Sequence, residues 1–378
     1  MVHGPLSRAE LARRLSLSSG NLTKITRPLI DGGYVRGLDA EMLAPTGRPS
    51  HRLEVVPDRA VFIGIKLTDD QMYVVLTGLT ANLVHDEQYE LGSHDPAAVI
   101  EQIALAINRI RDSGYPQIAG VGISLAGTST PASSHARNSE YLGWSDVPLA
   151  ELVEARVGLP ITLENDVRAL AAAEHWFGAA AGIDDFALIT VGVGIGCAMV
   201  INGELVSGQE GTAGMIEHWQ IDDRGSLCEL GHRGCLRSYL TTSAITRTVA
   251  VAAGLPGLTF QDCVDRSRAG DPLADRVFQD AGRALGILVA LLVNLMGPQL
   301  VLLSGESYQM YQAGESAIRA AMAEHLHWSV HPPELQVRPL TFTAWARGAA
   351  VIAIQRHVDL LTRAPPGAAW GAKGTRQS

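Results

Sequence analysis

The sequence is poor in cysteine and has no apolar run long enough to span a membrane. The four cysteines among the 378 residues are Cys197, Cys228, Cys235 and Cys263. This number is too low to suggest a disulfide framework, and cytoplasmic thiols stay reduced. The longest apolar stretch, residues 281–296, contains Arg283 and Asn294 and falls short of the ~20 residues that a span needs. No basic start followed by an apolar signal core is visible, so we expect a cytoplasmic protein that does not contact a membrane.

Positive charge is scarce overall but concentrated at one end. Lys and Arg number 30 against 39 Asp and Glu, which gives a net charge of −9. Residues 1–52 hold eight Lys or Arg and four acids, so this segment carries +4 and the remaining chain −13. A length of 378 residues, with 47% apolar and 18% charged residues, predicts a globular protein of two or three domains. A small basic domain on an acidic body indicates a polyanionic partner at that end only.

The basic segment has the pattern of two short helices joined by a tight turn. Ser7 and Glu10 have the spacing of a capping box, and Ser18 can cap a second helix that runs to about Asp31. Pro28 falls in the last turns of that helix, where a bend is tolerated. The inner faces are expected to hold Leu11, Ala12 and Leu15 in the first helix and Leu22, Ile25, Leu29 and Ile30 in the second. This arrangement is typical of a helix-turn-helix.

The outer face of the second helix carries side chains suited to DNA. Such a helix enters the major groove by its N-terminal half, where hydroxyl, amide and cationic groups contact base edges and phosphates. The residues that we predict to contact DNA in this helix are Ser19, Asn21, Thr23, Lys24 and Arg27.

Two predicted strands around a loop follow and would form a wing. Residues 34–36 and 52–55 are the strands, and Arg48 lies at the loop tip between Gly47 and Pro49, where it can reach into a minor groove. We therefore predict a winged helix-turn-helix DNA-binding domain over residues 1–56. Because only six residues precede Ser7, the first helix usual in winged domains is expected to be missing or very short. A small helical protein-docking module is the alternative.

From Ala60 onward, apolar strands alternate with helices. Strands are predicted at residues 61–65, 72–78, 85–91, 118–124, 187–191, 196–201 and 299–304, and helices at 96–113 and 278–296. This alternation indicates α/β architecture. The Pro- and Gly-rich tail, residues 364–378, is predicted to be disordered.

Three segments of this body resemble the ROK family (repressors, open reading frames and kinases). They are residues 163–171 (LENDVRALA), residues 190–196 (TVGVGIG), and His218 with Cys228 and Cys235. The resemblance covers roughly residues 60–360 and implies an actin-like, two-lobed, sugar-kinase-like domain, which we place at residues 57–363. Together with the winged arm, it resembles the family's repressor branch, typified by xylose and N-acetylglucosamine repressors.

The segments that would bind ATP depart from the family's kinase pattern. ROK kinases carry an Asp-x-Gly-Gly-Thr turn after the first strand, whereas this chain reads KLTDD, with Lys66 in place of the leading Asp and neither glycine. Acids in such a turn would repel phosphate and block the approach of the backbone. Val193 stands where the family has a phosphate-binding Thr, and Ser304 where kinases prefer Gly. We therefore expect no ATP binding and no enzyme activity, and the remaining glycines can simply serve tight strand turns.

The sugar side of the family site is partly retained. Asp166 resembles the catalytic base, but a carboxylate also accepts sugar hydroxyl hydrogen bonds, and Asn165 and Asp166 can cap the following helix. Met215 and Arg237 stand where the family has sugar-binding Glu residues. Arg237 could favour an anionic ligand such as a sugar phosphate, or could point to solvent. Tyr141 or Trp144 could stack on a sugar ring or belong to the core. The expected effector contacts are Asn165, Asp166, His218 and Arg237.

The resemblance also implies a structural zinc site, with one ligand replaced. ROK zinc sites combine a His with a Cys-x-Cys-Gly-x-x-Gly-Cys run, but Leu230 replaces the middle Cys here. His218, Cys228 and Cys235 supply three of the four ligands that zinc prefers, and His232 or Glu229 could supply the fourth. We expect zinc at His218, Cys228, Cys235 and His232. Without it, Cys228 and Cys235 would be buried thiols.

These observations together predict a sugar-responsive transcriptional regulator, acting as a repressor. It would bind double-stranded operator DNA as a homodimer or tetramer, and a non-catalytic kinase-like domain would sense a sugar or sugar derivative. An ATP-dependent sugar kinase with an accessory arm is one alternative, and a ligand-independent DNA-binding protein is another.

Overall fold

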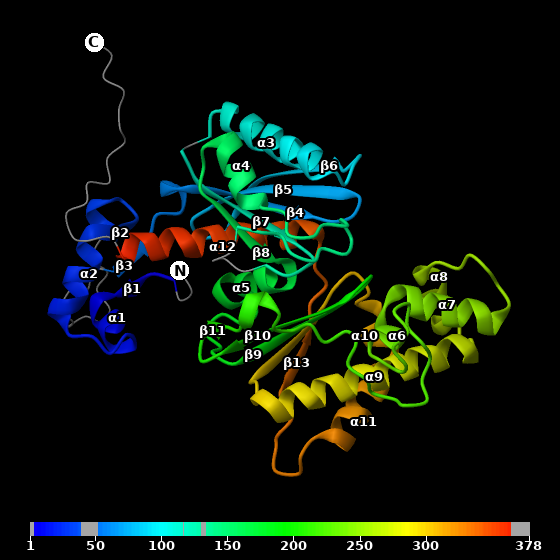
Figure 1. Cartoon of the computed structure of the whole chain (residues 1–378). Helices are drawn as coiled ribbons and strands as arrows, with labels where there is room; N and C mark the ends of the chain where they lie inside the picture. Colours follow the sequence, from blue (N-terminus) through cyan, green and yellow to red (C-terminus); the bar gives the residue numbers. More distant parts are fainter. Residues whose placement is uncertain (1–3, 39–51, 116, 130–133, 364–378) are drawn as a thin grey trace.

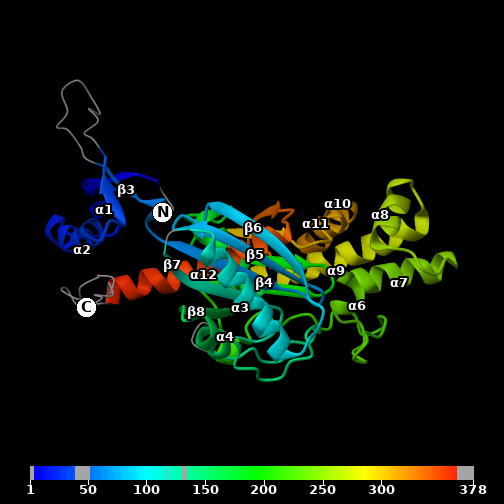
Figure 2. The same ribbon diagram turned by 90° about the horizontal axis from the view of Figure 1, so that it is seen from above.

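The computed structural model describes residues 4–38, 52–115, 117–129 and 134–363. An N-terminal arm and two larger lobes follow one another, with the arm at one end and helices α7 (Thr242–Ala253) and α8 (Phe260–Arg268) at the other (Figures 1 and 2). The predicted wing tip at Arg48 and the tail, residues 364–378, lie outside the described residues.

The arm contains the two predicted helices and a small sheet. Its elements are β1 (Leu6–Ser7), α1 (Arg8–Arg14), α2 (Ser19–Asp31), β2 (Val35–Gly37) and β3 (Arg52–Val55), and its sheet has the order β1-β3-β2. The capping box is present, because the Glu10 N–H donates to Ser7 Oγ at 3.2 Å and the Ser7 N–H donates to Glu10 Oε2 at 2.9 Å. Ser18 caps α2 by accepting from the Asn21 N–H at 3.2 Å. The short strand β1 was not predicted.

Two apolar residues of the arm lie on a different face from the one predicted. Ile25 is 50% exposed and Leu15 is 55% exposed, although both were expected on inner faces. In α2 the buried positions are Leu22 and Thr26, four residues apart, and the ~100° step between neighbouring residues of a helix turns Ile25 away from that line. Leu15 follows the last residue of α1 and so lies off the helix face.

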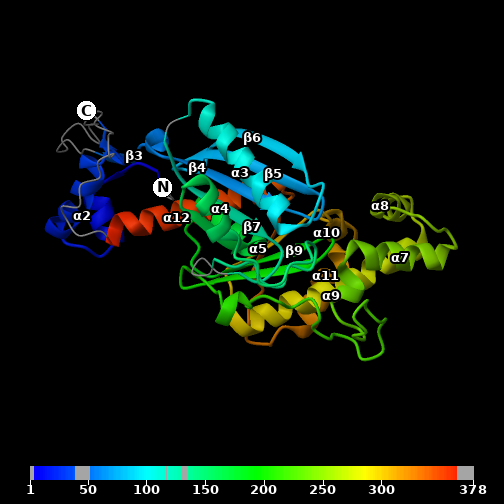
Figure 3. The same ribbon diagram turned by 45° about the horizontal axis from the view of Figure 1, so that its top comes forward.

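The first lobe is built on a five-stranded sheet with the order β6-β5-β4-β7-β8. Strands β4, β5 and β6 form an antiparallel meander, and β7 and β8 add in parallel to β4. Helices α3 and α4 cover one face and α12 the other (Figures 1 and 3). The elements are β4 (Val61–Leu67), β5 (Gln71–Gly78), β6 (Leu83–Glu90), α3 (Pro96–Asp112), β7 (Ile118–Leu125), α4 (Leu149–Val157) and β8 (Ile161–Asn165).

The second lobe repeats this plan with the strand order β11-β10-β9-β12-β13. Its first elements are α5 (Asp166–Phe177), β9 (Phe186–Val191), β10 (Ile195–Ile201), β11 (Glu204–Leu205) and α6 (Arg237–Leu240), followed by α7 and α8. The rest are α9 (Pro272–Met296), β12 (Leu300–Ser304), α10 (Gln309–Ala313), α11 (Glu315–His325) and β13 (Glu334–Val337). The α/β, two-lobed prediction is confirmed.

Helix α9 is long and apolar enough to cross a membrane by length and composition alone. Most of its apolar window is buried, however, and it packs against α7, α8 and α11 in the core of the second lobe. Its pattern is therefore explained by packing inside the fold.

The last helix, α12 (Phe342–Arg363), runs from the junction of the lobes to the arm (Figures 1 and 2). A Cβ at Gly64 of β4 or at Gly122 of β7 would overlap the backbone of α12, so these glycines let the helix lie directly on the sheet. At its far end, His357 Nε2 lies 3.1 Å from the Tyr34 hydroxyl oxygen of the arm. One rigid element thus contacts both the lobe junction and the arm.

Candidate functional site

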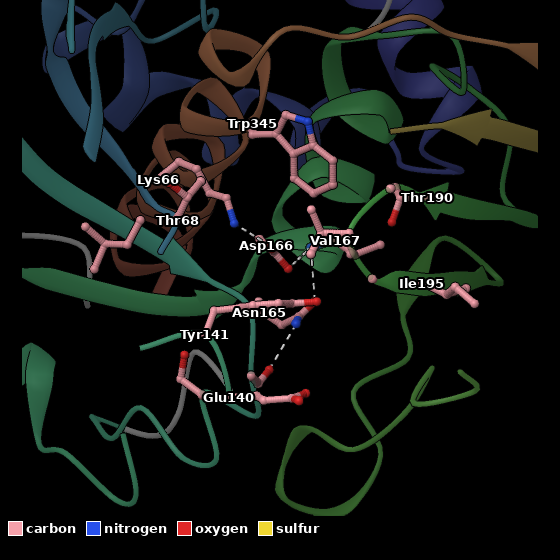
Figure 4. A pocket seen from close by; sticks show the side chains of 18 of the residues that line it. Lys66, Thr68, Glu140, Tyr141, Asn165, Asp166, Val167, Thr190, Ile195 and Trp345 are labelled. Carbon is pink, nitrogen blue, oxygen red and sulfur yellow. Dashed lines mark hydrogen bonds and ion pairs between the residues drawn. The ribbon is translucent and has the colours of Figure 1, made fainter. Parts of the chain in front are cut away.

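A cavity of about 460 Å³ lies between the two lobes. The β4–β5 turn, the loop at residues 138–142 and the start of α5 form one part of its wall. The β9–β10 turn, residues 213–217 and the first turn of α12 form the other part. Figure 4 shows side chains from β4, the loop at residues 138–142, the start of α5, the strands β9 and β10, and α12 around one space. A cavity at the meeting point of two lobes is a common place for a small-molecule site.

An ion pair joins Lys66 at the end of β4 to Asp166 at the start of α5. Lys66 Nζ donates to Asp166 Oδ2, and the two residues are only 4% and 7% exposed. The ammonium also lies 5.5 Å from the ring centroid of Trp345. Both side chains are labelled in Figure 4. A carboxylate held this way by a buried lysine is a poor general base, because taking a proton would leave the lysine charge without a partner. Asp166, which resembles the family's catalytic base, is therefore paired with Lys66, which replaces the leading Asp of the family's phosphate-binding turn.

Asn165 and Asp166 also cap α5, as the sequence allowed. Asn165 Oδ1 accepts from the N–H groups of Val167 at 3.0 Å and Arg168 at 3.2 Å, and its Nδ2 donates to the Gly127 carbonyl at 3.0 Å. Both Asn165 and Asp166 line the cavity. The capping and cavity-lining roles therefore coexist in the same residues.

A buried ion pair behind this cap stiffens the motif. Arg168 Nε donates to Glu164 Oε1 at 2.9 Å, and both side chains are almost fully buried. Burial raises the pKa of Glu164, and the charge and hydrogen bonds of Arg168 oppose this shift. Arg168 Nη1 also donates to the Ser207 carbonyl at 3.2 Å, which ties the start of α5 to the segment after β11.

Arg237 neither lines the cavity nor points to solvent. It is 9% exposed and donates to Glu217 Oε2 at 2.7 Å and to Glu229 Oε2 at 3.2 Å, with Glu140 Oε1 at 3.9 Å. Glu217 does line the cavity. Met215 and Arg237 both stand where the family has a Glu. The carboxylate in this part of the cavity comes instead from Glu217, two residues after Met215, and it pairs with Arg237. An anion would have to displace these carboxylates to reach Arg237.

His218 also lies behind the cavity wall. Its Nε2 is 3.6 Å from Glu217 Oε1, and it is absent from the described residues that line the cavity. The prediction that His218 and Arg237 contact the effector is therefore not supported by their placement. Arg237 instead holds the Glu217 carboxylate by a hydrogen bond, and His218 lies beside that carboxylate.

The two aromatic candidates separate clearly. Tyr141 lines the cavity and reaches across it, since a Cβ at Gly194 would lie 2.7 Å from its hydroxyl oxygen. Burial raises the pKa of Tyr141 to about 12, so its hydroxyl stays protonated. Trp144 is buried in the core of the first lobe and donates from Nε1 to the His94 carbonyl at 2.7 Å. Only Tyr141 is available to a ligand.

A cluster that can hold a metal lies beside Glu217. His218 Nδ1 is 3.8 Å from each of the sulfur atoms of Cys228 and Cys235. His232 Nδ1 lies 3.6 Å from Cys228 Sγ and 3.0 Å from His218 Nδ1. Leu230 is exposed and takes no part. The structure thus brings His218, Cys228 and Cys235 together as a possible ligand set, and His232 lies next to the first two. Glu229 instead pairs with Arg237.

The residues of α2 that were predicted to contact DNA are all accessible to solvent. Ser19, Asn21, Thr23, Lys24 and Arg27 are all exposed. Thr23 Oγ1 donates to the Ser19 carbonyl at 2.9 Å, and Arg27 Nε lies 3.7 Å from Asp31 Oδ2. Pro28, which directly follows Arg27, lies inside α2, and the helix continues past it to Asp31.

Several residues of the cavity wall were not singled out from the sequence, among them Glu217, Glu306 and Trp345. Glu217 could have been noticed, because it directly precedes His218. Glu306 could also have been noticed, because it lies two residues beyond Ser304, which was singled out from the sequence. Trp345 lies in the last helix, and no local pattern marks it.

Comparison with known proteins places this arrangement in a family. The ROK family profile matches residues 62–356. The chain belongs to the ROK family. It is 28% identical over 317 residues to the DNA-binding transcriptional dual regulator NagC of Escherichia coli K12, covering 80% of this chain and 77% of NagC. It is 25% identical over 375 residues to the xylose repressor of Bacillus spizizenii, covering 96% and 94%.

A solved ROK regulator matches a larger share of this chain than a solved ROK kinase does. A ROK family transcriptional regulator, described as a homologue of the E. coli Mlc protein, matches 95% of both chains with a TM-score of 0.83 and 26% identity. A ROK glucokinase from Streptomyces griseus, solved with glucose and AMPPNP, matches 78% of this chain and all of its own length, with a TM-score of 0.67 and 25% identity. The similarity to the regulators therefore extends to the arm, whereas the kinase matches a smaller part of the chain.

Proposed function

We propose that this protein is a sugar-responsive transcriptional regulator, acting as a repressor in the cytoplasm. The observation that carries the proposal is the Lys66–Asp166 ion pair, because it blocks base catalysis while Asn165, Asp166 and Tyr141 still line a sugar-sized cavity. The xylose repressor and the ROK transcriptional regulator named above, which match 96% and 95% of this chain, support the same conclusion.

The arm would bind operator DNA through α2 and its wing. The exposed Lys24 and Arg27 supply charge for phosphates, and Ser19, Asn21 and Thr23 supply groups for base edges. Two arms in a homodimer would contact two half-sites of a two-fold operator. Arg48 would contact the minor groove from the wing.

Ligand binding would be coupled to the arm through α12. Phe342 and Trp345 line the cavity, and His357 of the same helix contacts Tyr34 of the arm. A ligand that changes how the lobes close around Trp345 would therefore change the position of the arm. This coupling requires no chemical step.

The cluster of His218, Cys228, Cys235 and His232 would hold a structural zinc ion. Ideal tetrahedral zinc with ordinary Zn–S and Zn–N bonds separates sulfur from nitrogen by about 3.6 Å, and the sulfur–nitrogen distances here are 3.6 and 3.8 Å. Zinc would fix the loop that carries Glu229 and so hold Arg237 behind Glu217. The other ring nitrogen of His218, Nε2, faces the Glu217 carboxylate. Histidines that bind zinc commonly have a carboxylate near the ring nitrogen that does not bind the metal.

The experiment that tests the proposal combines thermal unfolding with DNA binding. The purified protein is melted with a panel of sugars, sugar phosphates and Mg-ATP, and the sugar that raises the melting temperature is added to a DNA-binding assay. Stabilisation by a sugar that also shifts operator affinity supports the proposal. A sugar that binds but leaves DNA affinity unchanged contradicts it and favours a ligand-independent DNA-binding protein. Stabilisation by Mg-ATP with phosphorylation of a sugar would favour the kinase.

A further inference from the structure

A carboxylate of the chain occupies the turn that a kinase would use for phosphate. The Val193 N–H, in the β9–β10 turn, donates to Glu306 Oε1 at 2.8 Å. A Cβ at Gly192 would overlap this carboxylate, so Glu306 lies directly against the glycine. Backbone N–H groups in glycine-rich turns are anion sites, because they offer donors at close approach without a side chain in the way. Here the anion is supplied from within the molecule.

The segment that carries Glu306 is shaped to reach this turn. Glu306 follows β12, and the preceding Gly305 has φ +110°, in the region that favours glycine. A Cβ at Gly305 would overlap the backbone of Val191 at the end of β9. Behind it, Ser304 Oγ donates to the Arg338 carbonyl at 2.8 Å, so the segment is held in place. Glycine at residues 192 and 305 thus permits the contact from both sides.

The charges around the cavity disfavour the binding of an anion in addition to Glu306. The described residues that line it include one basic side chain, Lys66, and six acidic ones: Asp69, Asp70, Glu140, Asp166, Glu217 and Glu306. The single ammonium is already paired with Asp166, and Arg237 outside the wall is paired with Glu217. A phosphate ester would bring up to two further negative charges into this field.

The uncharged part of the wall still suits hydroxyl groups. Ser139 lines the cavity and is 1% exposed, and its Oγ has no hydrogen-bond partner among the described residues. That oxygen is itself covered, so the groups open to a ligand hydroxyl come from its neighbours. Tyr141 and Asn165 supply donors nearby.

We propose that Glu306 is an internal substitute for phosphate and that it determines the ligand class. It occupies the anion-binding turn, keeps phosphorylated compounds out, and leaves the cavity to an unphosphorylated carbohydrate. This inference rests on the proposed function only for the carbohydrate, because the exclusion of phosphate can be tested without a known effector.

The test compares matched ligands on matched variants. Wild type, Glu306→Gln and a triple variant with Asp69→Asn, Asp70→Asn and Glu306→Gln are titrated calorimetrically. The probes are glucose, N-acetylglucosamine and xylose, a phosphate ester of each, and inorganic tripolyphosphate. Glu315→Gln is the control, since Glu315 lies on α11, pairs with Arg319 and does not line the cavity. Circular dichroism and melting confirm that each variant is folded.

The wild type is expected to bind one parent sugar at least tenfold more tightly than its phosphate ester. Glu306→Gln should change the affinity for the parent sugar less than twofold and should reduce the preference for the parent sugar over its phosphate ester. The triple variant should gain measurable tripolyphosphate binding. The control should behave as wild type. An ester that binds wild type as tightly as its parent sugar overturns the inference, as does a folded triple variant that gains no tripolyphosphate affinity. Failure of every sugar to bind, with tripolyphosphate binding gained, would refute the proposed sensor alone.

Discussion

The Lys66–Asp166 pair shows how one residue can change the chemistry of a cavity without changing its shape. Both charges are buried, and the attraction between them is weakly screened. Such a pair adds little net stability compared with apolar residues of similar size. Removing one partner, however, leaves the other charge buried without a partner, which destabilises the fold. The two residues are therefore expected to depend strongly on each other.

Replacing Lys66 by Met should lower the free energy of unfolding by about 3–5 kcal/mol, because Asp166 is left buried and unpaired. Urea unfolding measures this loss. The double variant Lys66→Met with Asp166→Asn should recover part of it, whereas strictly additive effects would contradict the pairing. The exposed pair of Arg283 and Glu324 is the control, and Arg283→Met should cost at most about 1 kcal/mol.

His357 gives the joint between α12 and the arm a dependence on pH. Its pKa is lowered, first by burial and second by the positive charge of Arg59, and its ring also faces Tyr34 and Phe62. The unfolded chain therefore binds the proton more readily than the folded chain, and stability falls as the pH drops below about 6.5.

The variant His357→Gln removes this contribution. Its free energy of unfolding should fall less than that of wild type between pH 7.5 and pH 5.5, in parallel urea titrations. Equal losses in the two proteins would show that His357 does not sense the pH. His327→Gln is a matched control, because His327 is exposed and follows α11 in the second lobe, away from Tyr34 and α12.

At the scale of single elements, α2 carries the prediction about DNA. Lys24→Ala and Arg27→Ala should each weaken binding to duplex DNA about equally for all sequences. Each should also reduce the slope of log affinity against log salt by about 1, because each removes a phosphate contact. Fluorescence anisotropy over a range of salt concentrations measures both effects. Arg319→Ala on α11, an exposed arginine of the second lobe, should leave the slope unchanged.

The loop that carries Cys228 and Cys235 should depend on metal. The purified protein is expected to contain about one zinc ion per chain by elemental analysis, and a chelator should lower its melting temperature. Cys228→Ser and His232→Ala should each reduce the zinc content. Cys263→Ser should retain it, because Cys263 is buried in α8, outside the cluster. Full zinc content in His232→Ala would show that the fourth ligand lies elsewhere.

The sequence predicted elements well wherever the pattern is local. The capping box of Ser7 and Glu10, the cap at Ser18 and the alternation of strands and helices are all confirmed. The inward placement of Ile25 was wrong, because a shift of one residue along a helix moves a side chain by ~100°. Helical periodicity alone did not determine which residues at the edge of the apolar face are covered.

The sequence predicted the cavity residues that belong to a local motif, but not those that long-range packing brings to the cavity. Asn165 and Asp166 follow a strand within a recognisable motif, so their position could be inferred. Lys66 was noticed as a substitution, but its partner lies 100 residues away. Glu306 and Trp345 reach the cavity through long-range packing, which leaves no periodic signal in the sequence. Arg237 looked like a ligand contact because the three carboxylates around it come from separate segments.

For the whole molecule, the important relation is the one between cavity and arm. If α12 couples them, breaking the contact between His357 and Tyr34 should separate sensing from DNA binding. Tyr34→Ala is expected to bind the effector with wild-type affinity and to bind DNA, but to lose most of the effect of sugar on DNA affinity. Trp328→Ala, at an aromatic residue that is 90% exposed in the second lobe, should keep that effect. Wild-type coupling in Tyr34→Ala would exclude this route.

The length of α12 sets the scale of any motion that it transmits. From Phe342 to His357 the helix extends ~22 Å at 1.5 Å per residue. Pivoting by about 5° at the cavity end would therefore carry the joint about 2 Å sideways, and in opposite directions in the two halves of a symmetric pair. The combined change of about 4 Å exceeds the ~3.4 Å rise between neighbouring base pairs. A sugar that moves Trp345 by a fraction of an ångström could thus shift two recognition helices out of step with the turns of the double helix.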